Sequence, residues 1–206
     1  MMRKIQSQKR SESTVDDISE AATQLLDTAG VGKFTTNHVA ERAGVSIGSL
    51  YRYFRDKGAI LRLIVRREIK KMRTRALATI AGSQASDAET LIDEIVVHST
   101  QNFGGRGAVV FQIRSLIEDD IVLLQEIRDA QIDVVQNLHE KMMDIAGKRR
   151  SPMSKAARAA AVDAFTTAVQ TLARYSSDKS VDAETRKRLL FSLLTALSEE
   201  EPKSEY

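Results

Sequence analysis

The chain has 206 residues, with no Cys, no Trp, two Pro and 5% aromatic residues. A disulfide framework and a thiolate metal site are therefore excluded, and a β-sandwich or barrel is disfavoured because its strands draw on aromatic residues. The net charge of +3 divides unevenly, since residues 1–75 hold 16 Lys and Arg against 8 Asp and Glu, and the rest hold 15 against 20. This basic N-terminal third indicates that one end of the protein meets a polyanion, with nucleic acid favoured over an anionic membrane surface.

The N-terminal sequence MMRKIQSQKR is basic, but no apolar segment follows it, so we expect no secretory signal. The longest strongly apolar stretch, residues 189–197, is far shorter than the roughly 20 residues that cross a bilayer. We therefore expect a soluble, cytoplasmic protein that does not enter a membrane.

Capping residues and apolar periodicity predict three short helices and then a long one. The predicted starts are, in chain order, Ser13 or Thr14, Thr35 or Thr36, Ser46 and Asp56. The first helix is expected to stop at Gly30, before a GVGKF loop, the second at Gly44 and the third near Tyr53. Further helices are predicted over about 87–103, 109–117, 120–146, 152–175 and 182–197, which makes nine in an all-α fold.

Residues 43–57, AGVSIGSLYRYFRDK, contain Gly44, Ser46 and Gly48 at the spacing of a hydrolase nucleophile elbow. An elbow needs a strand before the serine, whereas TTNHVAERA has helical periodicity. The alternative is a helix-turn-helix, which needs a small residue at the helix crossing and a turn residue that tolerates a left-handed conformation. Ala40 and Gly44 meet these two needs, and the packing positions are all apolar: Val39, Ala43, Val45 and Leu50.

A helix that enters the major groove needs small residues at its leading end and phosphate donors at its flanks. The leading residues Ser46, Ile47, Gly48 and Ser49 are of modest size, and Tyr51, Tyr53 and Lys57 are donors. Lys57 also stands in the first turn of a helix, where a cation opposes the helix dipole. Its position therefore favours a phosphate contact.

The segment TTNHVAERAGVSIGSLYRYFRDKGAIL, and VSIGSLYRYFRDK above all, resembles the N-terminal domain of the tetracycline-repressor (TetR) family of bacterial regulators. The resemblance covers about residues 13–65 and beyond them only length and helix count. It implies an N-terminal arm and helix-turn-helix domain over 1–57, and a larger helical domain for effector binding and dimerisation over 58–206. It also implies phosphate contacts at Thr36, Tyr51, Tyr53 and Lys57, and residues near bases at Asn37, Ile47, Gly48, Ser49 and Arg52. The alternatives are that Tyr53 packs inside the small domain and that Arg52 is a solvated helix residue.

The C-terminal two thirds are expected to hold an effector site among facing helices. Gln131 interrupts an apolar stripe of its predicted helix, and His98 lies at the spacing of the apolar residues in its own helix. Three further residues border this region on the two sides of the GGRG segment: Phe103, Phe111 and Arg114. The Ala-rich stretch from 156 to 168 and the leucines from 189 to 197 predict a homodimer through the last two helices. The alternative for Gln131 and His98 is that each is a core residue whose polar atoms are hydrogen-bonded within the protein.

We expect a homodimeric, operator-binding transcriptional regulator, a repressor released by a small molecule, with double-stranded DNA as its partner. The three histidines form no metal motif, no nucleotide-binding loop follows a strand, and no acid, base and nucleophile converge, so no metal, cofactor or catalytic site is expected. Two alternatives remain, a DNA-binding architectural or cell-division factor without a ligand, and a serine hydrolase that uses Ser46.

Overall fold

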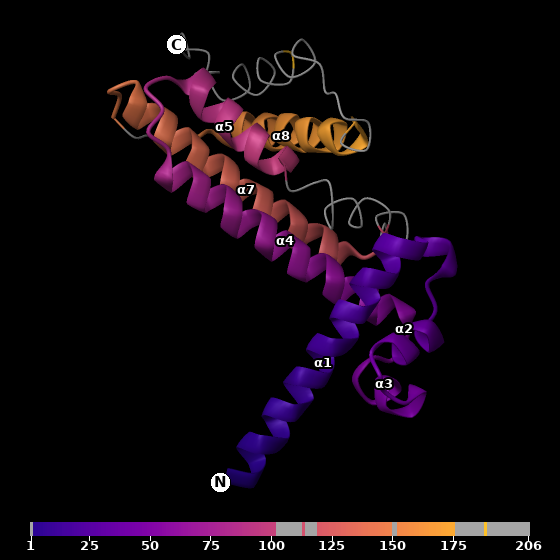
Figure 1. Ribbon diagram of the computed structural model, residues 1–206. Coiled ribbons are helices and arrows are strands. Elements are labelled where there is room, and N and C mark those ends of the chain that lie inside the picture. Colours follow the sequence, from indigo (N-terminus) through magenta and orange to yellow (C-terminus); the bar gives the residue numbers. More distant parts are fainter. Residues whose placement is uncertain (1, 102–112, 114–118, 150–151, 176–187, 189–206) are drawn as a thin grey trace. The chain divides into compact units, whose positions relative to one another are not determined.

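The computed structural model describes residues 2–101, 113, 119–149, 152–175 and 188, and these residues are helical or lie in turns and short connections (Figure 1). The elements are α1 (Met2–Ala29), the 3-10 helix η1 (Val31–Lys33), α2 (Thr36–Arg42), α3 (Ile47–Tyr53), α4 (Lys57–Gly82), α5 (Ala88–Gln101), α7 (Ile121–Ile145) and α8 (Lys155–Tyr175). No strand occurs among the described residues, so the prediction of an all-α fold is confirmed. The helices predicted over 109–117 and 182–197 fall almost wholly outside those residues.

The residues group into two compact units. The first unit consists of Met1–Glu68 with Ala108–Leu123, and the second of Ile69–Gly107 with Leu124–Tyr206. Both boundaries within the described helices fall inside an element, at the middle of α4 and in the first turn of α7. A functional division at residue 57 stays a prediction.

The first unit has a core made by the apolar faces of its helices, with α1 packed on α2 and α2 on α3. Its fully buried large side chains are Ile18, Leu26, Phe34, Leu50, Ile60, Ile64, Ile113 and Leu123. Burying a side chain of this size contributes about 1.5–3 kcal/mol relative to leaving it in water. The predicted packing positions Val39, Ala40 and Leu50 are buried, while Ala43 and Val45 are half-buried.

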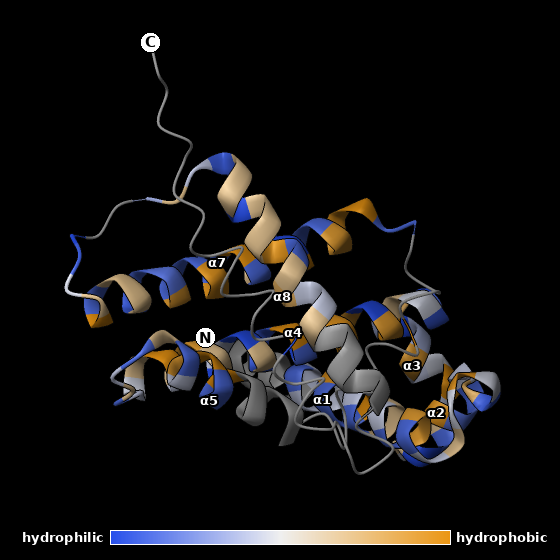
Figure 2. Ribbon diagram, turned by 90° about the horizontal axis from the view of Figure 1, so that it is seen from above, coloured by the Kyte–Doolittle hydropathy of each residue, from blue (hydrophilic) through white to orange (hydrophobic). Residues whose placement is uncertain are grey.

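The second unit has a separate apolar core, to which four helices contribute. Its buried members are Ile80 of α4, Leu91, Ile92 and Ile95 of α5, Val134, Val135 and Leu138 of α7, and Ala161, Val162 and Ala168 of α8. In Figure 2, apolar and polar residues alternate along the described helices. Such alternation gives each helix one face to bury and one to leave in water.

Side-chain caps fix the starts of several helices where the sequence predicted them. Asp87 caps α5, because its carboxylate accepts from the backbone N–H and the hydroxyl of Thr90, both at 2.8 Å. The hydrogen bond from the Thr90 N–H, followed by that from its hydroxyl, lowers the pKa of Asp87 from its usual 3.8.

Two predicted helix starts are wrong, and one predicted loop contains a short turn of helix. Helix α1 begins at Met2 instead of Ser13, because residues 2–12 contain no Gly or Pro to stop the helix. The GVGKF loop contains a turn of 3-10 helix. Helix α8 begins at Lys155, three residues after Pro152, because the Ser154 hydroxyl accepts from the N–H of Ala157 at 3.1 Å and supplies the cap.

Candidate nucleic-acid interface

The connection between α2 and α3 is a tight helix-turn-helix turn. Helix α2 starts at a cap from Thr35, whose side chain accepts from the N–H of His38. It ends in a Schellman motif, in which Val45 N–H donates to Ala40 C=O at 3.0 Å and Gly44 N–H to Glu41 C=O at 3.1 Å. Gly44 has φ of +66° and open space around it, so backbone conformation and not crowding accounts for glycine at this position.

Ser46 is the N-cap of α3. Its Oγ accepts from the N–H of Ser49 at 3.1 Å and lies 2.9 Å from the Ser49 hydroxyl. The serine therefore follows a helix and a turn, and the nucleophile-elbow interpretation is wrong because that motif requires a preceding strand. The cap fixes the start of α3, and the exposed residues Ile47 and Gly48 that follow it do not pack in the core of the first unit.

The leading end of α3 is exposed and small. Ser46, Ile47 and Gly48 are all exposed, and Ile47 retains 39% of its accessible surface although it is apolar. A Cβ placed on Gly48 would meet nothing closer than the Ser46 Oγ at 4.0 Å, so the fold itself does not require glycine there. Because these residues are small, the backbone at the start of α3 can come close to the edges of DNA bases, and the exposed Ile47 side chain can contact a thymine methyl group.

Tyr51 joins the two helices on the same exposed side. Its hydroxyl shares a hydrogen bond of 3.1 Å with the hydroxyl of Thr36 at the start of α2. The ring retains 49% of its surface. Thr36 and Tyr51 were both predicted as phosphate contacts, and the structure brings their hydroxyl groups together at the N-terminus of α2, where a helix dipole attracts anions. One hydroxyl donates to the other, so the pair keeps one proton for a phosphate oxygen.

Tyr53 is placed differently from the other predicted phosphate donors. Hydrogen bonding from the Ser11 side chain, with smaller effects from Thr14 and from the Arg52 guanidinium, lowers the pKa of Tyr53 from its usual 10.0. The half-buried phenol thus lies against α1. Arg52 stacks its guanidinium 5.9 Å from the centre of the Tyr53 ring and is otherwise exposed.

Lys57 and the start of α2 complete the predicted contact set. The Lys57 ammonium lies 5.4 Å from the centre of the buried Phe34 ring, a cation–π contact that offsets its unfavourable place in the first turn of α4. Asn37 is exposed beside His38, whose Nδ1 lies 3.1 Å from the Lys33 carbonyl oxygen. The sequence missed the contact of Lys57 with Phe34 because the two residues lie far apart along the chain.

The expected effector residues are only partly described. Phe103, Phe111 and Arg114 lie outside the described residues, and of His98 the structure describes only its place in α5. Gln131 is half-buried in α7. The structure therefore leaves this set of five residues as a prediction.

The second unit has an open groove that the sequence did not indicate. It is lined by Arg73 of α4 and by Glu126, Asp129, Ala130, Ile132, Asp133 and Gln136 of α7. Arg73 is ion-paired with Asp133 across it. Five of its seven lining residues have charged or polar side chains. Among the described residues, no group of three or more His, Asp or Glu could hold a metal ion. The described helices include none that is both long and apolar enough to span a bilayer.

Known proteins resemble this chain in part of its sequence and in its fold. Residues 18–64 match the profile of the family described as bacterial regulatory proteins, tetR family. An HTH-type transcriptional regulator of Staphylococcus aureus strain USA300 is 35% identical over 52 residues, which are 25% of this chain and 28% of that protein. The match to this curated relative thus spans little more than a quarter of its length.

Two solved structures share the fold over most of the chain. The fatty acid degradation regulator FadR from Bacillus halodurans aligns with a TM-score of 0.65 and 18% identity, over 91% of this chain and 97% of its own. The transcriptional regulator FadR from Bacillus subtilis, in complex with stearoyl-CoA, aligns with a TM-score of 0.63 and 18% identity, over 87% and 97%.

The described residues form a helical protein with an N-terminal helix-turn-helix whose second helix exposes its leading end. Residues 18–64 therefore form a domain of the TetR family of bacterial regulatory proteins. The resemblance seen in the sequence is thereby confirmed.

Proposed function

We propose that this protein is a sequence-specific, DNA-binding transcriptional regulator, a repressor that a small molecule releases from a palindromic operator. The observation that carries the proposal is the leading end of α3, where Ser46, Ile47 and Gly48 are exposed on a helix held by a Schellman turn. That combination suits a helix that enters the major groove and serves no purpose in the core of the first unit.

In this proposal the contacts divide into two kinds. Thr36, Tyr51 and Lys57 bind phosphates and so fix the register of the protein on the duplex, which carries no sequence information. Bases are read from the exposed side of α3 by Ile47, Gly48, Ser49 and Arg52, and by Asn37 at the start of α2. Tyr53 contributes through its ring and through its hydrogen bonding to α1, which orients α3.

Selection of DNA tests this function directly. The wild-type protein is used to enrich a random duplex library over several rounds, and a palindromic consensus with two half-sites about one helical turn apart is expected. The selected duplex, labelled with a fluorophore, then serves for anisotropy titrations. Enrichment of no sequence above the random background would contradict the proposal.

We further propose a homodimer through the two last long helices. Two half-sites on one duplex require two copies. Of the alanines in the predicted surface, Ala161 and Ala168 are buried in the core of the second unit, so only the exposed Ala156 and Ala160 of α8 would permit close approach of another helix. The leucines at 189–197 fall outside the described residues and complete this predicted surface. Sedimentation at micromolar concentration is expected to give a dimer, and Leu193→Glu to give a monomer. A wild-type monomer would contradict the dimer.

The effector is proposed to enter the domain that begins at residue 58. Because the B. subtilis neighbour was solved with stearoyl-CoA, long-chain acyl-CoA thioesters are the first class to test. A rise in the unfolding temperature with stearoyl-CoA or another member of a ligand panel would separate a ligand-released regulator from a ligand-free DNA-binding factor. Gln131→Leu and His98→Leu are expected to weaken the effector that such a panel identifies. Unchanged effector affinity in both variants would reject this placement of the site.

A further inference from the structure

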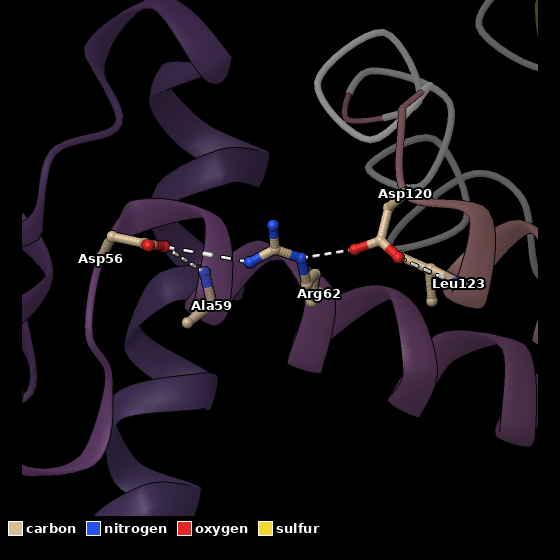
Figure 3. A network of polar contacts seen from close by, with 5 residues as sticks. All are labelled: Asp56, Ala59, Arg62, Asp120 and Leu123. Carbon is tan, nitrogen blue, oxygen red and sulfur yellow. Dashed lines mark hydrogen bonds and ion pairs between the residues drawn. The ribbon is translucent and has the colours of Figure 1, made fainter.

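One side chain of the first unit links the starts of two helices that lie far apart in sequence. The Arg62 Nε donates to Asp120 Oδ2 at 2.5 Å, and the Arg62 Nη1 lies 4.0 Å from Asp56 Oδ1 (Figure 3). Both carboxylates are also N-caps, since Asp56 accepts from Ala59 N–H at 2.8 Å and Asp120 from Leu123 N–H at 3.0 Å. One guanidinium therefore spans the first turns of α4 and α7.

The two ion pairs are unequal. Asp120 is the closer partner and the less exposed carboxylate, with 18% of its side-chain surface accessible against 54% for Asp56. Backbone hydrogen bonding from Leu123, followed by the Arg62 side chain, lowers the pKa of Asp120 from its usual 3.8, so this partner is charged at neutral pH. The direct hydrogen bond makes Arg62–Asp120 the dominant contact.

Gly58 keeps the space beside Asp56 open for the guanidinium. A Cβ on Gly58 would lie 3.1 Å from the Asp56 Oδ1 and 3.3 Å from the Arg62 Nη1. Because Arg62 itself retains 42% of its side-chain surface, its ion pairs contribute little to global stability. The effect of this bridge is therefore expected on position rather than on folding.

The bridge stands next to the candidate DNA-reading helix. Asp56 follows the last residue of α3 by three positions, and α4 continues directly from it. A regulator that places two recognition helices on one duplex needs each at a fixed orientation. A restraint on the first turns of α4 limits the orientations that α3 can take.

We propose that Arg62 is a positioning residue for operator binding, which acts through its ion pair with Asp120 and does not contact DNA. This inference rests on the proposed function. Loss of the pair widens the range of α3 orientations and weakens binding, whereas the helix caps remain. A partly exposed pair changes an equilibrium by up to about five-fold, which sets the expected size for each DNA-binding unit.

The test uses three variants of the full chain, Arg62→Gln, Asp120→Asn and Asp56→Asn, with the duplex selected by the wild-type protein. Asn retains an oxygen that can cap a helix, so both Asp variants remove one negative charge and keep the cap. Arg62→Gln and Asp120→Asn are each expected to weaken binding by up to about five-fold for each DNA-binding unit, and so by more on a duplex that binds two units. The double variant should be no weaker than either one, since both remove the same pair. Asp56→Asn serves as the matched control and should stay within about two-fold of the wild type.

The sign of the Asp120→Asn effect separates this proposal from a direct contact. Removing an acidic charge strengthens DNA binding if only the overall field matters, so weaker binding supports positioning. The slope of affinity against salt should stay unchanged in Arg62→Gln, whereas a lost phosphate contact would lower it by about one for each copy bound. Thermal unfolding of each variant checks the fold, and Arg62→Lys provides a milder substitution if Arg62→Gln unfolds.

Three results would each overturn the inference and leave the proposed function intact. The first is wild-type affinity in Arg62→Gln or Asp120→Asn, the second is tighter binding by Asp120→Asn, and the third is a reduced salt slope in Arg62→Gln. A wild-type protein that selects no duplex would instead overturn the proposed function, and this inference with it.

Discussion

Replacement of Gly48 by Ala should make the protein more stable and a weaker DNA binder at the same time. Gly48 is the second residue of α3, has helical backbone angles, and has no atom within 4 Å of an added Cβ except the Ser46 Oγ at 4.0 Å. Alanine therefore fits the folded unit. In a helix, Ala is favoured over Gly by about 0.5–1 kcal/mol, which corresponds to a rise of about 1–4 °C in the unfolding temperature of a chain of this length.

The expected effect on DNA binding has the opposite sign. If Gly48 approaches base edges at backbone distance, the new methyl group displaces α3 and costs at least one base contact, about 1–3 kcal/mol. That loss lowers affinity for the selected duplex about ten-fold or more. Anisotropy titration measures the affinity, and differential scanning calorimetry measures the unfolding temperature.

Gly82→Ala is the matched control for this experiment. Gly82 is the last residue of α4 and an added Cβ there also meets nothing within 4 Å, but it lies in the second unit. Its affinity for DNA should be that of the wild type. Wild-type affinity in Gly48→Ala as well would show that this residue is not near the DNA, and the docking of α3 would have to be revised.

Three further predictions concern single side chains. Lys57→Ala should lower the salt slope of DNA binding by about one unit for each copy bound. An unchanged slope would assign Lys57 wholly to its contact with Phe34. Tyr53→Phe should lower the unfolding temperature while the salt slope stays constant, because the hydroxyl is engaged by Ser11; a lower slope would restore Tyr53 as a phosphate contact. Asp87→Ala should be less stable than the wild type at pH 7. The difference in stability should shrink as the pH falls through the lowered pKa of Asp87, since a carboxyl with a depressed pKa stabilises the fold when it is ionised. Thermal unfolding at pH 7 and pH 2.5 tests this, and an equal difference at both pH values would contradict it.

The sequence alone predicted the helix-turn-helix because its signals act within a few residues. Thr35, Ser46 and Asp56 each cap the helix that follows them, and Gly44 takes the positive φ that the turn needs. A cap bond or a left-handed turn depends on the local backbone and hardly at all on the rest of the chain, so residue identity and spacing suffice.

Only the tertiary structure decided the roles of side chains that reach across the first unit. The phenol of Tyr53 is held by Ser11 of α1, and Arg62 pairs with Asp120, which is 58 residues away. Neither pairing has a spacing that could be recognised in advance, because long polar side chains choose partners by distance in the folded protein. The start of α1 at Met2 likewise overrode the local signal at Ser13, since a helix continues through a possible cap when nothing in the preceding residues stops it.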